Sequence, residues 1–150
     1  FKQTTTVSQN QDFLDRFTTY RTHIWQVAIE QFPSYWLNGV GLRGFDKIYQ
    51  LYPVDFKVHN YVNHPHMHAL EVMIETGTIG LVSYILLCCY LLYMTFIARE
   101  GNAWFLVAFL AIMPINSHAA LFEADWFPLV WLPLAIAFFK NHAKNSRLFY

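Results

Sequence analysis

The sequence GTIGLVSYILLCCYLLYMTFIA, residues 77–98, decides the fold class because none of its side chains is charged. In a helix, about 20 residues with a rise of ~1.5 Å each span the roughly 30 Å hydrocarbon core of a bilayer. Hydrophobic residues make up 55% of the 150-residue chain and charged residues only 13%, whereas soluble domains have about 25% charged residues. The segment predicts a transmembrane helix in an integral membrane protein.

Two further apolar runs follow this segment. The run over about 103–122 predicts a second membrane crossing. The run over about 126–140 contains Pro128 and Pro133 and predicts a kinked third crossing, with a re-entrant segment as the alternative. We therefore expect residues 77–150 to form two or three transmembrane helices and a short cytoplasmic tail.

The first half of the chain is more polar. Apolar side chains within residues 11–31 recur at three- and four-residue steps, which predicts an amphipathic helix. Residues 33–61 lack a sustained period and predict a loop with one short helix, and a second helix is expected to start near Pro65. Residues 1–76 are thus a helical loop region, and the fold class is all-α. The chain starts at Phe1 without a signal segment, so we expect a fragment of a longer polytopic protein.

The basic residues that flank the apolar runs predict the orientation in the membrane. Arg99 follows the first run, and Lys140, Lys144 and Arg147 follow the third. Lysine and arginine favour the cytoplasmic side, so three crossings would place residues 1–76 outside, where ATP and nucleotide sugars are not supplied. Ten basic residues balance ten acidic ones, which gives no indication of a nucleic-acid partner.

The densest set of reactive side chains is HNYVNHPHMHALEVMIE, residues 59–75, directly before the first apolar run. Histidine has an unperturbed pKa of about 6.5 and can take a proton from a hydroxyl near neutral pH. Helical spacing puts His68, Glu71 and Glu75 on one face, where either carboxylate could hold an imidazole in the required tautomer. The cluster predicts a site at the outer membrane surface.

Two other interpretations of the histidines stay open. They could be interfacial polar residues without chemistry. They could also bind a metal for transport or sensing in a non-enzymatic membrane protein, because His64, His66 and His68 alternate, with His59 or Met67 as a further ligand. The sequence lacks the second half of a known metal-binding spacing such as HExxH, so we expect no metal.

Three motifs occur in order: YRTHIWQVAI (residues 20–29), NGVGLRGF (38–45) and HPHMHALEVMIETGTIGL (64–81). Together they resemble the large outer loop of O-antigen ligases and of the related O-antigen polymerases and protein O-oligosaccharyltransferases. The first resembles the family's Arg-x-x-x-Trp helix and the second its GVG segment.

The third motif carries the most specific part of the resemblance. His66, Met67, nine further residues and Gly77 match the family's spacing of a histidine, a small polar residue, nine residues and a glycine. Met67 departs from the pattern, since the family usually has Asn, Ser or Gln there. The departure does not affect the histidine.

The resemblance implies a metal-independent, inverting glycosyltransferase of lipopolysaccharide biosynthesis, without a cofactor. Its donor would be an undecaprenyl-diphosphate-linked glycan and its acceptor a lipid A-core sugar hydroxyl. The enzyme would be a multi-pass protein of the bacterial inner membrane, in contact with membrane lipid, with its catalytic loop in the periplasm. Polymerase and protein O-oligosaccharyltransferase activities remain alternatives, because sequence does not reveal the acceptor.

The resemblance also implies roles for individual residues. His66 would be the catalytic base on the acceptor hydroxyl. Arg21, with Arg43 as second choice, would hold the diphosphate, because a guanidinium is always charged and matches phosphate oxygens. The other expected substrate-binding residues are His64, His68 and Glu71. For Arg21 a structural ion pair with an acidic neighbour is the alternative.

Overall fold

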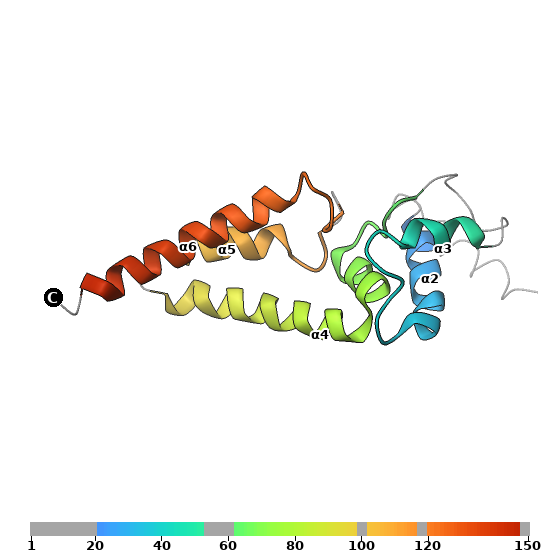
Figure 1. The fold of residues 1–150 in the computed structure, drawn as a ribbon, viewed down its shortest axis with the longest axis horizontal. Helices are drawn as coiled ribbons and strands as arrows, with labels where there is room; N and C mark the ends of the chain where they lie inside the picture. The colour runs from blue at the N-terminus through green and yellow to red at the C-terminus, as the bar shows by residue number, and fades with distance from the viewer. Residues whose placement is uncertain (1–20, 53–61, 99–101, 117–119, 148–150) are drawn as a thin grey trace, which may run out of the picture.

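The computed structural model describes residues 21–52, 62–98, 102–116 and 120–147. All regular structure in these ranges is helical (Figure 1), which confirms the all-α prediction for this part of the chain. The elements are α2 (Arg21–Gln31), the 3-10 helix η1 (Phe32–Tyr35), α3 (Phe45–Leu51), α4 (His68–Ile97), α5 (Asn102–Ala111) and α6 (Phe127–Arg147).

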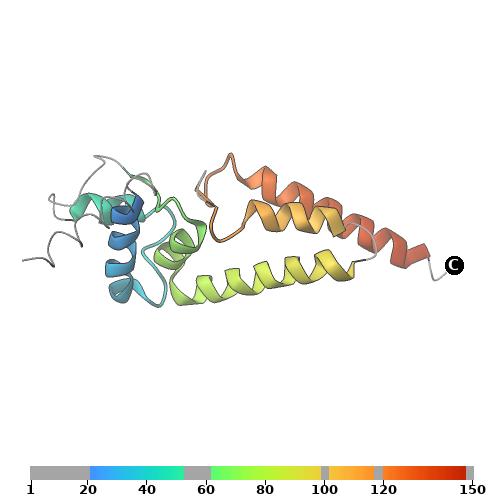
Figure 2. The ribbon, with the colours of Figure 1, turned by 180° about the vertical axis from the view of Figure 1, so that it is seen from behind.

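The helices form two groups along the long axis of the molecule. Helices α2 and α3 lie at one end, and α4, α5 and α6 extend from there to the other end, as both views show (Figures 1 and 2). Helix α5 packs against both α4 and α6. The loop between α5 and α6 returns to the end that carries α2 and α3.

Each group has its own apolar core. The first core joins α2, α3 and the start of α4, and it comprises Ile24, Val27, Ala28, Phe45, Ile48, Tyr49, Val62 and Ile74. The second joins α4, α5 and α6, and it comprises Val72, Tyr84, Cys88, Leu91, Phe105, Ala108, Ile112 and Ala137. Helix α4 contributes to both cores, so it is the element that connects the two groups.

Helix α4 is long and apolar enough to cross a membrane, with a mean hydropathy of 2.0 over its best 18-residue window, and within the described ranges no other helix meets that test. Only 17% of that window is buried. The core helix of a soluble protein would be mostly buried, so the exposed apolar surface favours contact with lipid. The uncharged part of α4 follows Gly77, and the acidic Glu71 and Glu75 precede it.

The other expected spans differ in extent from the apolar runs. Helix α5 ends at Ala111 rather than near residue 122, because the chain turns at Pro114, which cannot continue a helix. Helix α6 starts at Phe127 and continues through Pro133. The second and third crossings stay predictions.

The helix after the histidine-rich segment starts later than expected. It begins at His68, with Met67 as an extended N-cap residue, rather than near Pro65. The difference arises because His66 has a left-handed backbone, with φ of 54°, which a right-handed helix cannot include. Pro65 and His66 therefore belong to a turn. Of the amphipathic helix expected over residues 11–31, the structure shows a helix from Arg21, and residues 11–20 lie outside the described ranges.

A break at Gly77 divides α4 and joins it to the loop before α3. Gly77 has φ of 69° and ψ of −164°, a combination that essentially only glycine adopts. In an unbroken helix the Thr78 N–H would bond the carbonyl of Ile74. Here it donates to the carbonyl of Trp36 at 2.7 Å, and the Ile74 carbonyl accepts the Val40 N–H at 3.0 Å.

The same loop meets α4 at two more points. The Gly41 N–H donates to the carbonyl of Glu75 at 3.0 Å. Gly39 and Gly77 lie so close to the opposite backbone that neither has room for a side chain: a Cβ on Gly77 would come within 2.3 Å of the Leu37 oxygen. The GVG segment (residues 39–41) therefore packs directly against the ETG segment (residues 75–77).

We predict that Gly77→Ala destabilises the protein by roughly 3 kcal/mol or more, because alanine adds both backbone strain and a clash. Gly41→Ala is the matched control: its φ of 92° also strains alanine, but its Cβ would meet no atom within 4 Å. We expect it to cost about 1–2 kcal/mol. Thermal unfolding of the detergent-purified protein measures both, and equal losses would show that close docking of the loop is unimportant.

Candidate active site

The histidine-rich turn, residues 63–67, is held in place by the tryptophan of the first motif. The Trp25 Nε1–H donates to the carbonyl of Pro65 at 3.0 Å. Because Trp25 lies one helical turn after Arg21 on α2, this bond fixes the Arg-x-x-x-Trp helix against the turn. His66 is half-buried, and its ring centroid lies 4.1 Å from that of His64.

The start of α4 is fixed on its other side by the loop between α5 and α6. The His68 and Ala69 N–H groups, which have no partner within their own helix, donate to the carbonyls of Asn116 and Pro114, both at 3.1 Å. His68 is fully buried, and its ring lies edge-on to that of Trp126 with centroids 6.1 Å apart. The turn is therefore clamped between α2 and this loop.

His64 is buried, and two neighbouring side chains, His68 and Arg21, act on it electrostatically. Burial lowers the pKa of His64 below its ordinary value, and His68 and then Arg21 lower it further. Its Nδ1 lies 2.6 Å from the Asn63 Oδ1. His64 therefore stays neutral near pH 7, and half-buried Arg21 lies close enough to act on it electrostatically.

Glu71 points away from solvent and toward the backbone of the loop between α5 and α6. Only 1% of its surface is exposed, and its carboxylate accepts the N–H groups of Leu121 at 2.9 Å and Phe122 at 3.3 Å. Burial raises the pKa of Glu71 to about 6, although these two N–H groups lower it. In this structure Glu71 stabilises the loop that forms one side of the site.

Glu75 is also a buried carboxyl group that binds a loop backbone, in this case the backbone of the loop before α3. It is 1% exposed, and its Oε2 accepts the Arg43 N–H at 2.7 Å. Burial raises the pKa of Glu75 to about 7, and hydrogen bonds from the backbone of Arg43 and Phe45 oppose the rise. Arg43 itself has an exposed side chain and a left-handed backbone with φ of 58°.

The structure thus brings most of the predicted site residues to one end of the molecule. Arg21, His64, His66 and His68 lie together, at the junction of α2 with α4, and Glu71 supports them through the loop between α5 and α6. Arg43 lies apart from this group, because its backbone binds Glu75. Along α4, Glu75 is about 10 Å from His68 at a rise of ~1.5 Å per residue.

Sequence reasoning missed two features of this arrangement. Trp25 was matched to a motif, but nothing in the sequence reveals that its indole bonds the Pro65 carbonyl. The link from Glu75 to Arg43 joins residues 32 positions apart. The sequence contains both the GVG and the ETG segment, which was the available signal that the two interact. The break at Gly77 shows why they pack together.

The alternative metal site gains no support from the described residues. In residues 21–52, 62–98, 102–116 and 120–147, no three His, Cys, Asp or Glu side chains are grouped to hold a metal ion. His59, one of the possible ligands, lies outside the described ranges.

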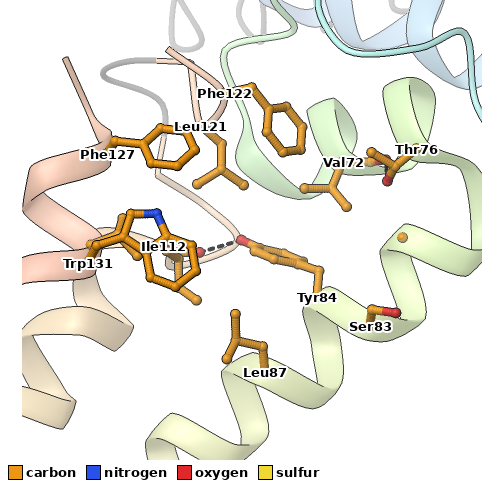
Figure 3. Close-up of a pocket in the computed structure, with 12 residues that line it drawn as sticks. Val72, Thr76, Ser83, Tyr84, Leu87, Ile112, Leu121, Phe122, Phe127 and Trp131 are labelled. Atoms are coloured by element: carbon orange, nitrogen blue, oxygen red, sulfur yellow. Dashed lines mark hydrogen bonds between the residues drawn. The ribbon is translucent and has the colours of Figure 1, made fainter. Parts of the chain in front are cut away.

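An apolar cavity of about 320 Å³ opens between α4 and α6, next to the loop that Glu71 holds (Figure 3). The Tyr84 hydroxyl donates to the carbonyl of Ile112 across it. Since its lining is almost wholly apolar, the cavity suits a hydrocarbon chain rather than a charged group. The lining residues are Val72, Thr76, Gly80, Ser83, Tyr84, Leu87, Ile112, Leu121, Phe122, Phe127, Val130 and Trp131.

Comparison with known families agrees with the convergence of the three motifs. A family model described as O-antigen ligase matches residues 2–85, more than half of the chain. The chain belongs to the O-antigen ligase family. Members are membrane enzymes of the ligase and polymerase type that act on lipid-linked glycans. No curated protein and no solved structure matches the chain.

Membership in the O-antigen ligase family confirms the resemblance drawn from the motifs. The matched residues include α2, α3 and the first part of α4. They therefore contain all six predicted site residues: Arg21, Arg43, His64, His66, His68 and Glu71.

We predict that Trp25→Phe lowers stability by about 1 kcal/mol, because phenylalanine keeps an aromatic ring but cannot donate to the Pro65 carbonyl. Trp36→Phe is the control, since the Trp36 side chain is 56% exposed and its carbonyl is unaffected. Thermal unfolding in detergent compares the two variants. Equal stability of the two variants would contradict an anchoring role for Trp25.

Proposed function

We propose that this protein is an O-antigen ligase: it transfers a glycan from an undecaprenyl-diphosphate carrier to a sugar hydroxyl of lipid A-core on the periplasmic side of the inner membrane. The observation that supports this most is that the third motif contacts both of the others: Trp25 of the first motif bonds the turn around His66, and the second motif docks on α4 beside Gly77. Helix α2 supplies Arg21 near the turn, and the broken helix α4 supplies the histidines.

In this proposal His66 is the catalytic base that accepts the proton of the acceptor hydroxyl. The hydroxyl oxygen attacks the anomeric carbon, the bond to the diphosphate breaks, and the configuration inverts. A half-buried histidine in a turn is suited to the task, because its ring is reachable while the backbone is fixed. The reaction needs no metal and no cofactor.

The leaving diphosphate develops negative charge, which fixed positive groups stabilise. We assign this role to Arg21 and Arg43. His68 and neutral His64 complete the substrate-binding surface near Arg21, and Glu71 contributes by holding the loop between α5 and α6. The alternative acceptors of the family, a second glycan chain or a protein hydroxyl, would use the same residues.

The membrane arrangement in this proposal follows from charge and shape. The turn around His66 and the acidic Glu123 lie at the same end of the molecule, where the Asn63 Nδ2 donates to the Glu123 Oε1 at 3.4 Å. Lys140 lies toward the other end of α6, with its Nζ 5.8 Å from the ring centroid of Trp104. This separation agrees with a periplasmic site and a cytoplasmic basic end.

We predict that His66→Ala lowers transfer by about 10²–10⁴-fold, the usual contribution of a general base. Arg21→Gln should also lower the rate of transfer, because the positive charge stabilises the leaving diphosphate, and it should raise the KM for the lipid-linked donor as well. The full-length protein is expressed in a ligase-deficient strain, and polymer attached to lipid A-core is measured. Accumulation of unattached lipid-linked polymer with the wild-type protein present would exclude the ligase.

The control for these variants is His142→Ala. His142 is an exposed histidine near the opposite end of α6, and its loss should leave transfer unchanged. Wild-type transfer by His66→Ala would exclude His66 as the base.

The apolar cavity between α4 and α6 supports a lipid-linked donor, because part of an isoprenoid chain could lie there while the diphosphate stays near the turn. We predict that Ser83→Trp, which fills the cavity, raises the donor KM by about tenfold. Val82→Trp is the matched control, since Val82 is the adjacent residue, is 51% exposed and does not line the cavity. Equal donor KM values for the two variants would exclude the cavity as a lipid site.

A further inference from the structure

The backbone of Arg43 adopts an unfavourable conformation. Its φ of 58° places a long-chain residue in the left-handed region, which is costly for residues other than glycine. The neighbouring Gly41 also has a positive φ, of 92°, but position 43 itself is occupied by arginine rather than glycine. Such a conformation persists only when its surroundings enforce it.

Glu75 provides the enforcing contacts. Its Oε2 accepts the Arg43 N–H at 2.7 Å, and its carboxylate also accepts a backbone hydrogen bond from Phe45. Its own carbonyl accepts the Gly41 N–H at 3.0 Å. Glu75 therefore contacts the loop before, at and after Arg43.

The carboxylate of Glu75 does not itself face a substrate. It is 1% exposed and it binds the backbone of the loop, whereas the Arg43 side chain is exposed. The arrangement separates the two functions: a buried carboxyl group fixes the backbone, and the guanidinium remains available at the surface. A simple surface ion pair would instead occupy the guanidinium.

We propose that Glu75 is a positioning residue, which holds the left-handed backbone of Arg43 so that its guanidinium faces the diphosphate of the lipid-linked donor. The inference rests on the proposed function, in which Arg43 binds that diphosphate. In this inference Glu75, from the third motif, acts on the donor only through Arg43, from the second motif.

Three substitutions at Glu75 separate hydrogen-bond geometry from charge. Glu75→Ala removes the acceptor, and we expect the donor KM to rise about tenfold, as for weakening one charge-assisted contact. Glu75→Gln keeps the length and one acceptor oxygen, so we expect partial rescue, within about threefold of the wild-type KM. Glu75→Asp keeps the charge but is one methylene shorter, so we expect no rescue. Rescue by Asp but not by Gln would overturn the proposal.

A double-mutant cycle with Arg43→Ala tests whether Glu75 acts through Arg43. If it does, Glu75→Ala has little further effect on the donor KM once Arg43 is already alanine. An equal effect in both backgrounds would overturn the proposal, because Glu75 would then act elsewhere. Transfer by the purified full-length protein, measured over a range of donor concentrations, provides the KM values.

Glu71→Ala is the matched structural control. Glu71 is an equally buried carboxylate on the same helix that also accepts two backbone N–H groups, but from Leu121 and Phe122. We expect its effect to add independently to that of Arg43→Ala. Equal coupling of both glutamates to Arg43 would indicate a general loss of structure and would overturn the proposal.

The test distinguishes failure of this inference from failure of the proposed function. If His66→Ala abolishes transfer while Arg43→Ala leaves the donor KM unchanged, the function stands and the positioning role is overturned. If His66→Ala retains full transfer, the proposed function itself fails.

Discussion

The exchange of backbone hydrogen bonds at Gly77 is the interaction on which the rest of the structure depends. Without the break, the Ile74 carbonyl would accept the Thr78 N–H within α4, whereas here it accepts the Val40 N–H at 3.0 Å. The segment before α3 would then lose the hydrogen bond from Thr78 to the Trp36 carbonyl, and its bond from Val40 to α4 would compete with the bonding of the helix itself. One residue without a side chain thus couples the helical loop region to the long apolar helix.

Buried carboxylates extend this coupling on either side of α4. Glu71 binds backbone N–H groups of the loop between α5 and α6, and Glu75 binds those of the loop before α3. Each burial is unfavourable for a charged group, which is why the pKa of both rises. The N–H groups offset part of that cost. The two glutamates, four residues apart, organise two loops from one stretch of helix.

Much of the fold and of the candidate site could be predicted from local sequence, and the remainder depended on contacts between distant residues. The uncharged run after Gly77 predicted the long apolar helix, and the motif spacing identified the family. The helix start was predicted near Pro65, but the left-handed backbone of His66 delays it to His68. Helical spacing grouped His68, Glu71 and Glu75, but it could not show which loops the two carboxylates bind.

Because α4 carries the candidate site at its start and the apolar stretch directly after Gly77, no separate linker lies between the proposed chemistry and the predicted membrane span. Eight residues lie between His68 and Gly77, and the rise from one to the other is roughly 14 Å at ~1.5 Å per residue, so in the proposed orientation the height of the reacting atoms above the lipid is fixed. In the proposed function an acceptor sugar would have to come to that height. Insertion of a single residue there would turn the histidines by about 100° around the helix, so the length of this segment is constrained as strictly as its chemistry.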